Sequence, residues 1–127
     1  MTPHRLLLDT HVFLWWMADD ARLGREAREA IGAADVVYVS AASAWEAALK
    51  ISIGKLRLKE RFSKGVTACG FMPMPIEMAH AEAVMEIPLH HRDPFDRMLV
   101  AQALVEGLTI VTHDEQIRPY RVPVLFA

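Results

Sequence analysis

The stretch HRDPFDRMLVAQALVEG, residues 91–107, contains a full set of helix start and stop signals. Asp93 is a good N-cap, because its short carboxylate can accept hydrogen bonds from the unpaired N–H groups of a first helical turn. Pro94 suits the first helical position, where its missing N–H costs nothing. Gly107 is a common helix stop. The sequence therefore predicts a helix that begins at Asp93 and ends near Gly107.

This helix carries a second acid, Asp96, three positions after its cap. A negative charge there is favoured by the helix dipole, so Asp96 could be an ordinary surface acid. The residues that follow on the same side of the helix are apolar, however: Leu99, Val100 and Ala103. A carboxylate at the head of a buried face must be hydrogen-bonded, neutralised or bound to a metal, because burying it alone is very costly. Asp96 therefore predicts partner groups elsewhere in the chain.

Composition limits the class of protein. The 127 residues are 53% hydrophobic and 24% charged, which predicts one globular domain over residues 1–127. No apolar run approaches the roughly 18 residues of a membrane span, and the start of the chain is not a signal peptide. Lone Cys69 excludes an internal disulfide, so we expect a cytoplasmic protein without membrane contact. A net charge of −2 argues against a protein that coats nucleic acid non-specifically.

Strand and helix patterns alternate along the chain. Strands are predicted at residues 4–8, 36–40, 108–112 and 122–126, with a possible strand at 71–75. The prolines of that last segment, FMPMP, confine it to a sheet edge. Further helices are predicted at residues 12–17, 24–34, 41–54 and 77–85. No element is assigned to the Lys-rich stretch that extends to about residue 70. This alternation indicates an α/β sandwich around a short, mainly parallel sheet.

Two more acids follow predicted strands. Asp9 comes directly after RLLL, and Asp114 lies two residues after LTIVT. If those strands are parallel, both acids emerge at the carboxyl edge of the sheet, where open α/β folds place their sites. Taken singly, each acid is better explained as a cap: Asp9 for the helix near His11, and Asp114 for a turn at EQI.

Glu46 is the fourth candidate acid. One side of its predicted helix carries the set Ala42, Trp45, Glu46, Leu49 and Ile53, which places Glu46 on or beside a buried stripe. The alternative is a surface ion pair with Lys50, four positions on, worth only about 0.3 to 0.5 kcal/mol. Four acids from four separate segments at strand ends or inward helix positions favour a shared site. Hard cations such as Mg²⁺ and Mn²⁺ prefer such oxygen ligands, and they suit phosphodiester hydrolysis.

The ordered segments RLLLDTHVFLWW, SAASAWEAALKISIGKLRL, HRDPFDRMLVAQA and LTIVTHDEQI resemble the PIN-domain ribonucleases, especially the VapC-type toxins of bacterial toxin-antitoxin pairs. The resemblance covers nearly the whole chain. It implies a three-layer α/β/α sandwich that cuts RNA with Mg²⁺ or Mn²⁺. It also implies that Asp9, Glu46, Asp96 and Asp114 are the metal-binding, catalytic acids, with Asp93 as a cap that is close enough to reach a water ligand or a second metal.

The same resemblance implies partners for the chain. These are an RNA substrate, a VapB-like antitoxin whose C-terminal segment lies in a hydrophobic groove and directs a basic side chain toward the acids, and a second copy in a homodimer. The adjacent residues Trp15 and Trp16 point about 100° apart on a helix, so they are either both buried between sheet and helices or mark a partner surface.

Several other residues could assist such a site. A basic stretch that is either an RNA track or simply a solvated face contains Lys50, Lys55, Arg57, Lys59, Arg61 and Lys64. Arg92 and Arg97 could hold phosphates, although Arg97 could also be exposed helix surface. The hydroxyls of Thr10 and Thr112 could orient the neighbouring carboxylates or a water. A zinc site is disfavoured, because no Cys pair or HExxH spacing accompanies His80, His90, His91, His113 and Cys69.

Two other functions compete with a nuclease. A catalytically silent PIN-like binding module is disfavoured by the presence of all four acids. An aspartyl-phosphate phosphatase or receiver domain also places an Asp after its first strand, but Asp9-Thr10-His11 lacks the second nearby acid of those folds and leaves Glu46 without a role.

Overall fold

The computed structural model describes residues 5–89 and 92–127, and its centre is a five-stranded sheet. The strand order is β3-β2-β1-β4-β5, and every neighbouring pair is parallel. The strands are β1 (Arg5–Leu8), β2 (Val36–Ser40), β3 (Met72–Met74), β4 (Thr109–Thr112) and β5 (Val124–Phe126). Each lies within a predicted segment, and the proline-containing β3 is at an edge, as predicted. His4, His90 and His91 lie outside the described residues.

Six α-helices connect these strands in the described ranges. They are α1 (Thr10–Ala18), α2 (Arg25–Ala33), α3 (Ala41–Ser52), α4 (Phe62–Ala68), α5 (Met78–Ala83) and α6 (Pro94–Glu106). Two 3₁₀ turns, η1 (Val84–Glu86) and η2 (Glu115–Ile117), follow α5 and β4. Among residues 5–89 and 92–127, no helix combines the length and apolar character that a membrane crossing needs. Cys69 is a free thiol.

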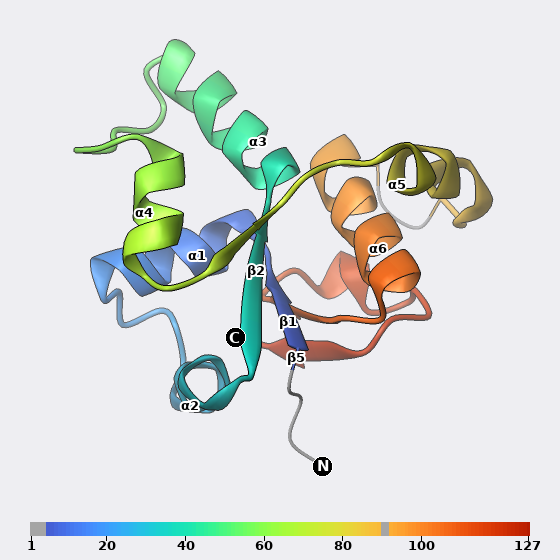
Figure 1. Cartoon of the computed structure of the whole chain (residues 1–127), viewed down its shortest axis with the longest axis horizontal. Helices are drawn as coiled ribbons and strands as arrows, with labels where there is room; N and C mark the ends of the chain where they lie inside the picture. The colour runs from blue at the N-terminus through green and yellow to red at the C-terminus, as the bar shows by residue number, and fades with distance from the viewer. Residues whose placement is uncertain (1–4, 90–91) are drawn as a thin grey trace.

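The helices form two outer layers around the sheet (Figure 1). Side chains of β1 alternate between two cores: Leu6 and Leu8 pack with the residues of α1, α2 and α4, whereas Leu7 packs with those of α6. Leu6, Leu7 and Leu8 are all fully buried, as expected for the central strand of a parallel sheet covered on both faces. The expected three-layer α/β/α sandwich is confirmed.

Helix α6 is built as its sequence predicts. Asp93 accepts hydrogen bonds from the N–H groups of Phe95 (2.8 Å) and Asp96 (3.2 Å), and Gly107 ends the helix with a φ of 70°. The apolar side below Asp96 is fully buried. Only residues 107–108 separate α6 from β4, so the chain reverses and the first turn of α6 lies toward the carboxyl end of the sheet. Figure 1 shows this pale-orange turn at the end of the molecule where β2 passes into α3.

The prediction of a buried apolar stripe along the whole length of α3 is wrong. Trp45, Leu49 and Ile53 are 56%, 45% and 65% exposed, whereas Glu46 is 8% exposed and Ala47 is buried. Figure 1 shows the reason: only the start of α3 lies against the sheet, and the rest extends beyond it. A helix that leaves the core has no surface against which a full-length apolar stripe could be buried.

Helix α4 was not predicted, because it lies in the Lys-rich stretch and buries only Val66. It is held through Phe62, whose ring packs against Phe13 of α1 at a centroid distance of 4.9 Å. Gly65 permits the close approach of the two helices, since a Cβ atom there would lie 2.6 Å from the Met17 sulfur. Because so few residues of α4 contact the rest of the protein, its basic sequence shows little hydrophobic periodicity.

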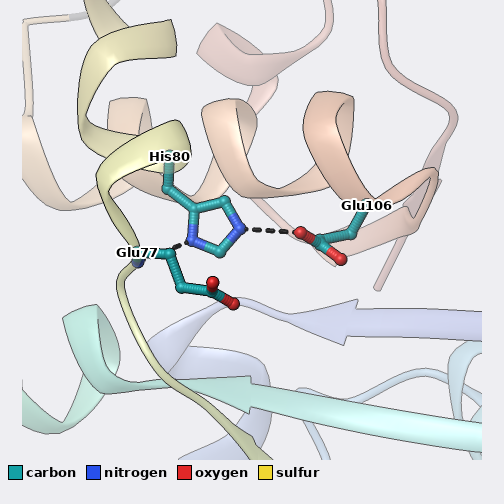
Figure 2. Close-up of side chains that lie close together, drawn as sticks. All are labelled: Glu77, His80 and Glu106. Carbon is teal, nitrogen blue, oxygen red and sulfur yellow. Dashed lines mark hydrogen bonds and ion pairs between the residues drawn. The ribbon is translucent and has the colours of Figure 1, made fainter.

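A buried histidine fastens α5 to the end of α6 (Figure 2). The Nδ1 atom of His80 accepts a hydrogen bond from the Glu77 N–H at 3.0 Å, so Nε2 carries the proton and donates to Glu106 at 2.9 Å. The His80 side chain is 1% exposed. Beside it, the Gln102 amide donates to the Pro75 carbonyl at 3.2 Å. One ring nitrogen of His80 therefore caps the start of α5, and the other joins α5 to the end of α6.

Replacing His80 with alanine should lower the free energy of unfolding by about 1–3 kcal/mol, because buried donors and acceptors lose their partners. Urea denaturation of wild type and variant measures the difference. Glu82→Ala, an exposed change on the same helix, is the control and should stay within about 0.5 kcal/mol of wild type. Equal stability of His80→Ala and wild type would mean that the histidine does not fasten α5 to α6.

Candidate functional site at the carboxyl edge of the sheet

Asp9 lies at the end of the central strand and is 4% exposed. Its Oδ1 atom accepts the Val12 N–H at 2.8 Å, so it caps α1, which was the alternative that the sequence left open. Its Oδ2 atom accepts the Thr112 hydroxyl at 2.5 Å and lies 3.8 Å from Nδ1 of His113. Burial raises the pKa of the Asp9 carboxyl, although these hydrogen bonds and the histidines His11 and His113 oppose the rise.

Thr112 connects Asp9 to Asp114. Its hydroxyl oxygen accepts the Asp114 N–H at 3.0 Å while it donates to Asp9. Asp114 also caps the η2 turn, because its Oδ1 atom accepts the Gln116 N–H at 2.9 Å. Strands β1 and β4 are parallel neighbours with Leu8 opposite Val111, so both acids emerge at one edge, as the sequence predicted.

Glu46 is directed toward the same edge by two hydrogen bonds. The Thr10 hydroxyl donates to its Oε1 atom at 2.6 Å, and the Lys50 ammonium donates to its Oε2 atom at 2.9 Å. The Lys50 pair is therefore present, but it does not make Glu46 a surface residue, because the Glu46 side chain is only 10% exposed. Thr10 follows Asp9 directly, so Glu46 lies beside the end of β1.

The packing of α3 against α6 brings the start of α6, which carries Asp96, to the part of the edge where α3 carries Glu46. The rings of Trp45 and Phe95, the residues that precede the two acids, meet at 4.9 Å in an edge-to-face arrangement. Asp96 is half-buried at the start of α6, and Asp93 occupies the cap position just before it. Four segments that are distant in sequence therefore direct four acids to one end of the sheet.

The four acids do not form a closed ligand cage. Within the described part of the chain, only Glu77, His80 and Glu106 have metal-ligating atoms that all lie within 4.8 Å of one another. That cluster is at the other end of α6, about 15 Å from Asp96 at 1.5 Å per residue. Its histidine already uses both nitrogens, so it lacks a lone pair for a metal.

The acids at the sheet edge instead offer oxygen donors only. Each of the carboxylate oxygens named above accepts a hydrogen bond, and a carboxylate oxygen has a second lone pair. Like charges in a partly dry site repel one another, and a bound cation would offset this repulsion. PIN nucleases in general use divalent metals, and this donor set fits a hard divalent cation.

The basic residues named as RNA-binding candidates lie in different surroundings. A groove of about 900 Å³ beside α1 is lined by several, including Lys50, Lys55, Arg57 and Lys59. Exposed Arg92 lines a second pocket, of about 700 Å³, together with Trp45 and Phe95. Arg97 has a different use: its guanidinium donates to the carbonyls of Pro88 and Val84, each at 3.0 Å, and ties the segment after α5 to α6.

Sequence reasoning missed two features of this edge. The Ser43 hydroxyl is buried on α3, one turn before Glu46, without a hydrogen-bond partner among the described residues. Its helical spacing of three from Glu46 was the available signal. The other feature is an aromatic corner next to Asp9 that consists of Trp15, His11 and His113, with ring centroids 4.7 to 6.3 Å apart. Nothing in the local sequence pairs His113 with α1.

A family model for the PIN domain matches residues 6–123, and the chain therefore belongs to the PIN-domain family. Among curated proteins it is similar to Ribonuclease VapC22 of Mycobacterium tuberculosis, with 33% identity over 125 residues and 93% of each chain covered. The predicted family and its fold are thus confirmed from sequence and structure together.

Solved structures share the fold at much lower identity. VapBC2 from Rickettsia felis, bound to a DNA fragment from its promoter, matches with a TM-score of 0.71 at 11% identity, over 96% of this chain and 98% of that chain. A toxin-antitoxin complex from Klebsiella pneumoniae matches with a TM-score of 0.64 at 17% identity, over 94% and 95%. FitAcB from Neisseria gonorrhoeae matches at 0.65 and 18%, over 94% and 96%.

Proposed function

We propose that the protein is a Mg²⁺- or Mn²⁺-dependent endoribonuclease that hydrolyses phosphodiester bonds of RNA. The observation that carries this proposal is the placement of Asp9, Glu46, Asp96 and Asp114, from four segments, at the carboxyl edge of one parallel sheet. Open α/β sheets bind their ligands at that edge. Membership of the PIN-domain family and the similarity to Ribonuclease VapC22 support the assignment.

In this proposal the four acids hold the metal and the threonines position them. The Thr112 hydroxyl positions Oδ2 of Asp9 and the backbone of Asp114 through hydrogen bonds. The Thr10 hydroxyl positions Glu46 in the same way. A divalent ion bound there would lower the pKa of an attacking water and neutralise charge on the phosphate. Asp93 remains the helix cap, since one of its oxygens already accepts two N–H groups.

The basic groove beside α1 would hold the RNA backbone. Lys50 bonds to Glu46 and also lines the groove, so the groove begins at the acidic site. Lys55, Arg57 and Lys59 continue it along the segment after α3. Arg92 would hold phosphate on the other side of the site. Arg97 is not part of the proposed RNA-binding surface, because its Nη1 and Nη2 atoms donate to backbone carbonyls.

We further propose that the chain is the toxin of a toxin-antitoxin pair, that a VapB-like antitoxin neutralises it, and that it forms a homodimer in the cytoplasm. The solved relative from Klebsiella pneumoniae is a toxin-antitoxin complex, and the one from Rickettsia felis is VapBC2. An aspartyl-phosphate mechanism is disfavoured, because it gives no role to Glu46, which is directed to the same edge as Asp9.

The pair Asp96→Asn and Asp93→Asn tests the division of roles on α6. Asparagine caps a helix about as well as aspartate, so both variants should fold. Removal of a ligand charge should make Asp96→Asn more than about 100-fold slower in Mg²⁺-dependent cleavage of total cellular RNA, whereas Asp93→Asn should stay within about fivefold of wild type. Equal losses in the two variants would refute this division, and no cleavage by pure wild type would favour a silent binding module.

Expression of the chain alone should arrest bacterial growth, and expression of Asp96→Asn at the same level should not. The reason is that growth arrest by a nuclease needs its metal ligands, whereas a burden from expression does not. Colony counts after induction, with immunoblots for equal amounts of soluble protein, measure the effect. Normal growth with high levels of folded wild-type protein would count against the toxin assignment.

A further inference from the structure

Lys50 differs in charge from the other group that positions Glu46. The Thr10 hydroxyl, which donates to Oε1 at 2.6 Å, is neutral, whereas the Lys50 ammonium, which donates to Oε2 at 2.9 Å, carries a full positive charge. The Glu46 side chain is 10% exposed, so its charge is compensated by these two contacts more than by water. Lys50 is therefore the counter-ion of Glu46 in the metal-free protein.

A divalent cation bound to Glu46 conflicts with this ammonium. Hard divalent ions bind carboxylate oxygens at roughly 2.0 to 2.6 Å. If the ion and the ammonium both contacted Oε2, they would lie within about 5 Å of each other. Two cations at that distance repel strongly in a site that water reaches only in part. A neutral donor such as the Thr10 hydroxyl causes no such conflict.

Of the two partners, Lys50 is the one that can move. Its side chain is 36% exposed, lines the groove beside α1 and has a flexible four-carbon stem. Glu46 is nearly buried and is held by the Thr10 hydroxyl. A cation that takes Oε2 thus displaces the ammonium into the groove, while the Glu46 carboxylate stays at the edge of the sheet.

An exposed pair of the same spacing shows how this contact differs from an ordinary helix ion pair. Glu60 and Lys64 are also four positions apart, but their charged atoms are 3.5 Å from each other and the side chains are 57% and 69% exposed. Both charges of such a pair are hydrated, so breaking it costs little. The Lys50 pair is shorter and its acid is nearly buried, so its loss reduces the free energy that metal binding releases.

We infer that Lys50 competes with the metal for Glu46 and thereby raises the metal concentration at which the site is filled. This inference rests on the proposed metal-dependent ribonuclease function and names how that site is regulated. Lys50 acts on the metal through Glu46 and is therefore a positioning residue. Once displaced, its ammonium is free to contact a phosphate in the groove.

The test measures metal binding without RNA. Electron paramagnetic resonance of free Mn²⁺ during a titration gives the Kd of the protein for this ion. Lys50→Met keeps the apolar stem and removes the ammonium. The variant should bind Mn²⁺ about tenfold more tightly than wild type, because no hydrogen bond between charged groups has to be broken. Without metal it should melt lower than wild type, because Glu46 has lost its counter-ion.

Lys64→Met is the matched control. It removes the same charge from a Glu–Lys pair of the same spacing, and its Kd for Mn²⁺ should stay within about twofold of wild type. Thermal melting verifies that each variant is folded.

Nuclear magnetic resonance of the lysine ammonium groups tests the displacement in wild type. An ammonium bound to a nearly buried carboxylate exchanges protons with water more slowly than a free one. The Lys50 signal, assigned by its absence in Lys50→Met, should therefore be visible without metal and disappear at saturating Mg²⁺.

Equal or weaker Mn²⁺ binding by folded Lys50→Met would overturn the inference, and so would an equal gain in Lys64→Met. A Lys50 signal that persists unchanged at saturating Mg²⁺ would also overturn it. Metal binding and RNA cleavage by wild type need no variant. Their absence rejects the proposed function and this inference with it, whereas their presence with no gain in Lys50→Met rejects this inference alone.

Discussion

The hydrogen bond between the Thr112 hydroxyl and Asp9, at 2.5 Å, joins residues 103 positions apart and organises the whole edge of the sheet. It compensates part of the cost of burying a carboxylate at the end of the central strand, a cost expressed in the raised pKa of Asp9. It also fixes the register at which β1 and β4 end, and through the Asp114 N–H it positions a second acid. The arrangement of the other acids depends on this edge, since Glu46 is reached from Thr10, the next residue after Asp9.

Capping and metal binding are compatible roles for these acids. Asp9 and Asp114 each cap the element that follows them, and in each case one carboxylate oxygen suffices for the cap. Asp93 is different: it caps α6 at the same edge, but the acid that heads the buried side is Asp96, in the first turn of that helix. A local structural reason for an acid therefore does not exclude a functional one, and convergence in space decides between them.

Local chemistry made much of this fold predictable. The caps Asp93 and Gly107, the buried leucines of β1 and the edge position of FMPMP all follow from signals within a few residues. The placement of the four acids followed from parallel strands and a family resemblance, and their role as ligands stays a prediction. The predictions that were wrong concern contacts between distant segments. The exposure of the apolar residues on α3 depends on where the sheet ends, which the local sequence does not show. The use of Arg97 and the contact of Trp15 with His113 likewise depend on how segments meet.

If Asp9 and its neighbouring acids form a divalent-metal site, Mg²⁺ should stabilise the folded protein, and thermal melting with and without Mg²⁺ measures this effect. Because burial raises the pKa of Asp9, its charged form costs folding free energy above the ordinary pKa of an aspartate, and this cost vanishes as the pH falls below it. At neutral pH, Mg²⁺ binding should offset this cost in wild type, whereas Asp9→Asn has no such charge to neutralise. Saturation at 100 times the Kd should raise the wild-type melting temperature by about 5 to 15 °C, and clearly less in Asp9→Asn. Equal shifts with Na⁺ at matched ionic strength, or an undiminished Mg²⁺ shift in Asp9→Asn, would contradict the metal site.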